Sequence, residues 1–127
     1  MRTAILWTGV AALILTVPVA VPAATSLRGV MHSWRADARS IGAMLTAREP
    51  FNDQAMRDAL QRYVTDAGHV EAAINTRSSE GRAFKRYLAT FEADARTALG
   101  HVDQRHVLRA DFERMMGACR SCHDRFN

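Results

Sequence analysis

The residues with the clearest chemistry lie near the C-terminus, in the run Cys119-Arg120-Ser121-Cys122-His123. C-x-x-C-H is the attachment signature of a c-type haem, in which both thiols form thioethers with the haem vinyl groups and the histidine supplies an axial nitrogen. On a helix, residues i, i+3 and i+4 share one face, so these three side chains would face one side of a flat ring. The sequence therefore predicts one covalent haem c held by Cys119, Cys122 and His123.

Other uses of a C-x-x-C pair fit the chain less well. Cys119 and Cys122 are the only two cysteines, so no second pair completes a four-cysteine zinc or iron–sulfur site. A redox dithiol normally lies at a helix start beside a strand, and no segment here has a strand pattern. A dithiol is the alternative to haem attachment.

The N-terminal segment is almost uninterruptedly apolar from Ala4 to Val21, and Arg2 is the only charged residue in the first 27. Val21-Pro22-Ala23 then supplies the small residues that a signal peptidase reads. An uncleaved membrane anchor is the alternative, although two prolines interrupt the far end of the run. Because bacteria attach haem c outside the cytoplasmic membrane, we expect residues 1–23 to be a cleaved export signal. Residues 24–127 would then form a periplasmic domain without stable membrane insertion.

Length and charge exclude several classes of protein. The 104 residues after the signal make one small domain, and they carry 16 basic and 13 acidic side chains. The signs are interspersed, and two haem propionates would offset most of the excess, so no nucleic-acid partner is expected. No Ser/His/Asp order, phosphate loop or carboxylate pair stands out, so we do not expect an enzyme.

Apolar residues recur at three- and four-residue steps through the rest of the chain, which predicts four amphipathic helices and no strands. A proline at position 50 ends the first helix, because the residue before a proline avoids helical angles. The short connections favour an all-α, antiparallel, up-down-up-down four-helix bundle. The predicted helices cover about residues 25–48, 53–74, 82–100 and 103–126. The inward stripe of the first comprises Leu27, Val30, Met31, Trp34, Ala38, Ile41 and Leu45.

This arrangement resembles the cytochrome c′ family, the class II c-type cytochromes, whose haem motif lies on the last helix of a four-helix bundle. The segment from Gly117 to Phe126 is similar to the family's closing motif, with glycine before the first cysteine and an aromatic residue three after the histidine. Ala47 to Asn52 resembles its turn between the first two helices. The second connection is shorter than usual. The chain ends at Asn127, where many members place an arginine near the haem, so a role for that arginine does not transfer.

The resemblance leaves the second axial position open. In the family, that position is either covered by an apolar residue, with five-coordinate iron, or filled in a low-spin subset by a methionine of the first helix. Counting back from Pro50 to the family's distal position reaches Met31, which also lies on the inward stripe. A thioether is a soft, neutral iron ligand. We therefore expect Met31 to ligate the iron opposite His123, with core packing as the alternative.

Other candidate ligands are less well placed. His32 lies about 100° round the helix from Met31 and is expected to be solvated. Met115 and Met116 share a helix with His123, so they cannot reach the opposite side of the ring. His101 and His106 lie about 25–33 Å before His123 along the helix axis, at 1.5 Å per residue. His69 is expected at the surface, and Met44 and Met56 in the core.

Two functions follow from the resemblance. With His/Met ligation, the protein would be an electron carrier that meets periplasmic redox proteins through small, transient contacts. With an open distal site, it would instead bind nitric oxide or carbon monoxide as a sensor or scavenger. Family members often dimerise through the first two helices, so a homodimer is also compatible with the sequence.

Overall fold

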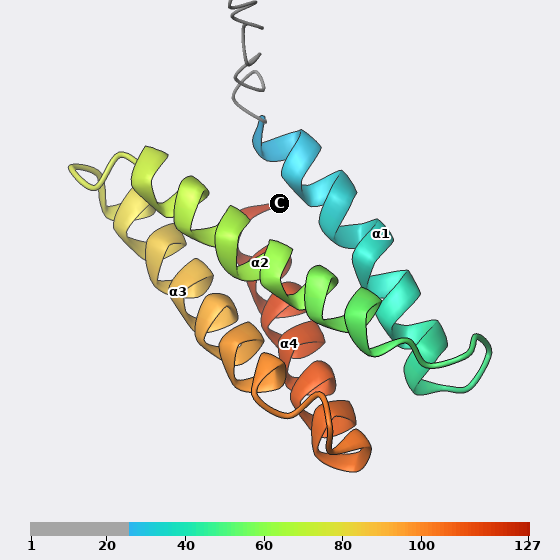
Figure 1. Cartoon of the computed structure of the whole chain (residues 1–127). Coiled ribbons are helices and arrows are strands. Elements are labelled where there is room, and N and C mark those ends of the chain that lie inside the picture. The colour runs from blue at the N-terminus through green and yellow to red at the C-terminus, as the bar shows by residue number, and fades with distance from the viewer. Residues whose placement is uncertain (1–25) are drawn as a thin grey trace, which may run out of the picture.

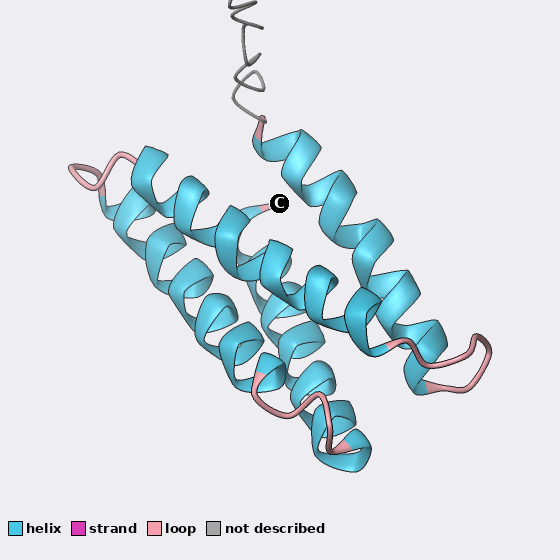
Figure 2. Cartoon of the chain, viewed as in Figure 1, coloured by secondary structure: helices cyan, strands magenta, loops and turns pink. Residues whose placement is uncertain are grey.

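Four α-helices joined by short loops make up the fold, as the computed structural model of residues 26–127 shows (Figure 1). They are α1 (Leu27–Leu45), α2 (Asp53–Ala73), α3 (Ser79–Leu99) and α4 (Arg105–Phe126). Successive helices run in opposite directions, and no strand occurs in the described range (Figure 2). The expected all-α four-helix bundle is therefore confirmed. The predicted export signal, residues 1–23, lies outside the described residues.

Local polar residues fix where three of the helices begin. The side-chain oxygens of Ser26, Asn52 and Ser78 each accept a hydrogen bond from a backbone N–H three residues later, the standard way to satisfy a free donor at a helix start. The cap at Ser78 starts α3 inside the stretch predicted as loop. By contrast, α4 begins two residues later than predicted, after a turn in which the N–H of Gln104 donates to the carbonyl of His101.

The end of α1 also differs from the sequence prediction by three residues, because the helix stops at Leu45 and not at position 48. Ala47 has a positive φ of 57°. Its N–H donates to the carbonyl of Met44, and the N–H of Arg48 donates to that of Ala43. These are the two bonds of a Schellman motif, which closes a helix through one left-handed residue that is usually glycine. Because the left-handed residue here is an alanine, the sequence has no glycine that would indicate the end of the helix.

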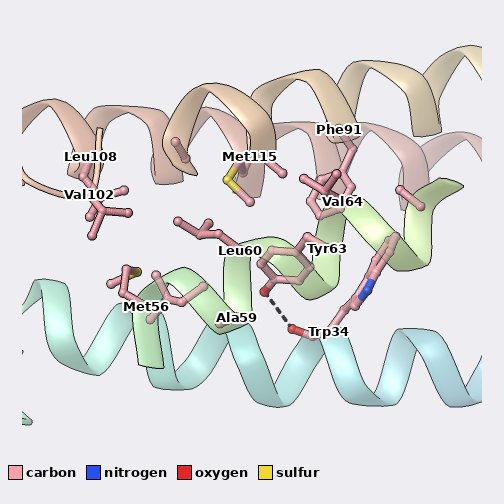
Figure 3. Packing of buried hydrophobic residues seen from close by; sticks show 14 of the residues in the cluster. Trp34, Met56, Ala59, Leu60, Tyr63, Val64, Phe91, Val102, Leu108 and Met115 are labelled. Atoms are coloured by element: carbon pink, nitrogen blue, oxygen red, sulfur yellow. Dashed lines mark hydrogen bonds between the residues drawn. The ribbon is translucent and has the colours of Figure 1, made fainter. Parts of the chain in front are cut away.

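The core is built from buried side chains of all four helices (Figure 3). α2 packs along α3, and α3 along α4, whereas α1 has fewer contacts and makes them mainly with α2. The α1 stripe joins the core only from Val30 onward. Leu27, predicted to face inward, is instead 47% exposed, because the first turn of α1 is not covered by the other helices. No helix in the described part of the chain is long and apolar enough to cross a bilayer.

The left-handed residue at position 47 gives a stability prediction. Ala47→Gly should raise the free energy of unfolding by about 1 kcal/mol, because glycine adopts a positive φ without the steric cost of a Cβ. Ala36→Gly, at an exposed position inside α1, should instead lower it by about 1 kcal/mol. Urea denaturation of both variants checks the pair. Equal destabilisation by both would mean that α1 does not end in this motif.

Candidate cofactor site

A cavity of about 520 Å³ lies between α1, α2 and α4. Met31 lines it from α1, Tyr63 from α2, and Cys119 and His123 from α4. The other lining residues are His32, Trp34, Arg35, Ala38 and Met116. Residues far apart in the sequence therefore surround one space. Apart from Tyr63 and Met116, all of them belong to α1 or to the C-x-x-C-H segment.

A second, narrow pocket of about 30 Å³ lies on the side of α3. Met31, Cys119 and His123 line this pocket as well as the larger cavity, and Cys122 lines only the narrow one. The rest of its wall comes from Trp34 of α1, Ala118 of α4 and four aromatic or aliphatic side chains of α3: Phe84, Tyr87, Leu88 and Phe91. All four predicted site residues are thus brought to one end of the bundle.

The C-x-x-C-H segment is helical throughout, within the last two turns of α4. Both cysteines are half-buried and carry free thiols, and His123 is exposed. A continuous helix places positions i, i+3 and i+4 on one face. The structure therefore holds the three side chains on the side of α4 that borders the pockets, as the spacing predicts.

The environment of the two thiols is unlike that of a catalytic dithiol. Burial raises the pKa of Cys119 to about 11, with the neighbouring Cys122 adding to the shift and Arg120 opposing it. Burial also raises the pKa of Cys122. A redox-active cysteine needs a lowered pKa, usually from nearby cations or a helix N-terminus. These cysteines lie instead near the C-terminal end of α4, where the helix dipole disfavours a thiolate. The surroundings therefore weigh against the dithiol alternative.

Trp34 holds the α1 wall in place one helical turn after Met31. Its ring is buried, with its centroid 5.6 Å from that of Tyr63 on α2 and 4.7 Å from that of Phe91 on α3. The indole Nε1–H donates to Asp66 over 3.1 Å. The Tyr63 hydroxyl donates to the Trp34 carbonyl over 3.0 Å (Figure 3). One residue of α1 is thus tied to two other helices.

The remaining sequence candidates divide between the cavity and the rest of the fold. His32 is exposed, as predicted, but it also lines the cavity together with Arg35. Met116 lines the cavity from the same helix as His123, and Met115 is fully buried. His101 lies outside the cavity, with its Nδ1 2.6 Å from a carboxylate oxygen of the buried Asp111.

Sequence reasoning did not assign Tyr63 or Arg35 to the site. Tyr63 fits the apolar three- and four-residue spacing of its helix, and Arg35 lies among the polar residues of α1. Their positions beside the cavity depend on how α1 is set against α2, which hydrophobic periodicity does not encode.

No protein-family model matches the sequence, and a search of curated proteins finds no match. The case for a cofactor therefore rests on the residues of this chain and their geometry.

The hydrogen bond between α1 and α2 gives a prediction about the site wall. Tyr63→Phe should lower the free energy of unfolding by about 1 kcal/mol, because it removes the buried bond to the Trp34 carbonyl and keeps the ring. Tyr87→Phe is the matched control, since Tyr87 is a half-buried tyrosine packed on Phe126, and it should change stability by a few tenths of a kcal/mol at most. Chemical denaturation measures both. An unaffected Tyr63 variant would show that this bond does not hold α1 in solution.

Proposed function

We propose that this chain is a periplasmic c-type cytochrome of the cytochrome c′ class that carries electrons. One haem would be attached through Cys119 and Cys122, with His123 and Met31 as axial ligands. The observation that carries the proposal is that Met31 on α1 and His123 on α4 line the same cavity, beside the cysteines. The export signal on which the compartment depends remains a sequence-based expectation.

The residues around the cavity suit a flat, largely apolar group. A volume of about 520 Å³ falls within the roughly 300–1,000 Å³ typical of cofactor sites. Most of the lining is apolar or aromatic, with the polar exceptions His32, Arg35 and His123. The free, protonated thiols are those that haem attachment would consume, since no other cysteine is present. Cys119 lines both the cavity and the narrow pocket, and Cys122 lines the narrow pocket.

A haem bound here would supply a one-electron couple between ferric and ferrous iron. Cys119 and Cys122 would anchor it to α4, and His123 and Met31 would offer one nitrogen and one thioether from opposite helices. A thioether ligand raises the reduction potential, because neutral sulfur favours ferrous iron. Trp34 and Tyr63 would keep water away from the inner wall, since both are buried in the core.

The first test concerns attachment. The full chain, produced in a bacterium that matures c-type cytochromes, should yield a protein that begins near Ala24 and carries the added mass of one haem that acid–acetone does not extract. Cys119→Ser/Cys122→Ser should remove the covalent haem, because no other thiol is present. Intact mass measures both expectations.

Ser121→Ala, on the exposed side of the same turn, is the control and should keep the haem. A wild-type protein without the added mass, under conditions in which another c-type cytochrome matures, would contradict the proposal.

The second test concerns the distal ligand. The wild-type protein should be low-spin in both oxidation states, and the ferric form should show the near-infrared charge-transfer band of sulfur–iron ligation. Met31→Leu fills a similar volume without sulfur. It should make the iron high-spin, admit carbon monoxide and lower the reduction potential. Optical spectra and potentiometry provide the measurements.

Met116→Leu is the matched control, because Met116 lines the same cavity from the helix that carries His123. Its spectrum and potential should stay those of the wild type, as should those of His32→Gln. A wild-type protein that is already five-coordinate would show that Met31 does not ligate. Binding of nitric oxide or carbon monoxide, with Met31 covering the iron, would then replace electron transfer as the proposed function.

A further inference from the structure

Four basic side chains form an exposed strip along α1: Arg28, His32, Arg35 and Arg39. Their spacing of four, three and four residues keeps them on one side of the helix. At 1.5 Å per residue the strip extends over about 16 Å. It is therefore a continuous basic surface and not a set of scattered charges.

The arginines of this strip have no acidic partner in the described part of the chain. Six ion pairs occur between residues 26 and 127, and none of them involves Arg28, Arg35 or Arg39. The only acidic residue of α1, Asp37, is already engaged by two hydrogen bonds from Arg62 of α2. The positive potential of the strip is thus directed to solvent.

The strip runs along the edge of the candidate cofactor site. His32 and Arg35 line the cavity, and Met31 lies next to them in the chain. Because electron transfer slows steeply with distance, a partner is best placed on the surface closest to the redox group. A protein seated on the strip would meet that condition.

We infer that the strip on α1 is the docking surface for an acidic redox protein. This inference rests on the proposed haem, and it adds the chemical class of the partner and the face it occupies. Complementary charge steers two proteins together and speeds their encounter. It also suits the small, quickly dissolving interfaces of electron-transfer pairs, because exposed ion pairs add little affinity.

The first experiment measures the charge at the electron-transfer surface of the purified holoprotein. The reduced protein is oxidised by ferricyanide, an anion, and by tris(phenanthroline)cobalt(III), a cation, in a stopped-flow spectrometer. At about 10 mM ionic strength, charges up to about 30 Å apart interact. Arg28→Glu/Arg39→Glu should slow oxidation by ferricyanide about tenfold and speed oxidation by the cobalt complex. Both effects should largely disappear at about 1 M salt.

Arg48→Glu/Arg86→Glu is the matched control, since it changes the net charge equally at exposed positions on the α1–α2 turn and on α3. Its ferricyanide rate should stay within about twofold of that of the wild type. Neither double variant alters a residue that lines the cavity, so both should keep the wild-type haem spectrum. Equal slowing by both variants would show that only net charge matters and would overturn the inference.

The second experiment tests for a polypeptide partner. Poly-L-glutamate should slow ferricyanide oxidation of the wild-type holoprotein at low salt by covering the strip, and it should have little effect on the Arg28→Glu/Arg39→Glu variant. Poly-L-lysine should not compete. Vesicles that contain phosphatidylglycerol test an anionic membrane instead. Binding to these vesicles without any effect of poly-L-glutamate would overturn the inference.

The two proposals fail separately. A chain without covalent haem overturns the proposed function before any rate is measured. A haem protein whose oxidation rates do not change when the α1 arginines are replaced overturns only the proposed docking surface.

Discussion

The indole of Trp34 packs against both Tyr63 of α2 and Phe91 of α3, whose rings also contact each other. The indole N–H and the Trp34 backbone carbonyl are both hydrogen-bonded to α2. Burying a tryptophan removes about 150–250 Å² from water, which at about 25 cal/mol per Å² contributes about 4–6 kcal/mol. This matters because α1 has fewer contacts with the bundle than the other helices have. Trp34 is therefore a principal anchor of α1 and of the residues that α1 brings to the cavity, alongside its other buried residues and the ion pair between Asp37 and Arg62.

The cavity follows from the same arrangement. α2, α3 and α4 pack along one another and share a continuous core that includes Leu60, Leu108 and Met115. α1 joins that core through Trp34, Ile41 and three further buried residues, whereas Met31 and Ala38 border the cavity. The three are Val30, Met44 and Leu45. A bundle in which every helix packed equally closely would leave no room between α1 and α4. The cavity thus lies where α1, the helix with the fewest contacts, borders α2 and α4.

Much of this was predictable from the sequence, and what was not has identifiable physical causes. Helical periodicity predicts the four helices and the stripe that brings Met31 inward, and the spacing of C-x-x-C-H predicts a shared face on α4. The end of α1 was predicted wrongly, because its left-handed residue is Ala47 and not a glycine. Leu27 follows the apolar pattern but extends beyond the other helices, so its exposure depends on tertiary packing alone. The place of Tyr63 and Arg35 in the cavity wall depends on the spacing between helices, which no local pattern encodes.

The two proposed roles of α1, ligation of the iron and docking of a partner, belong to different sides of the helix. Met31 would offer a soft, uncharged ligand to the cavity. The next residue, His32, lies about 100° round the helix and belongs to the exposed basic strip. Both sets of residues lie within one or two turns of Trp34, and an α-helix of this length moves as a rigid element. A shift of Trp34 in the core would therefore displace the candidate iron ligand and the basic surface together. Anchoring a lightly packed helix through a residue between these two sets would keep the distance from the proposed haem to the proposed docking surface constant. That distance is the quantity on which an electron carrier's rate depends most steeply.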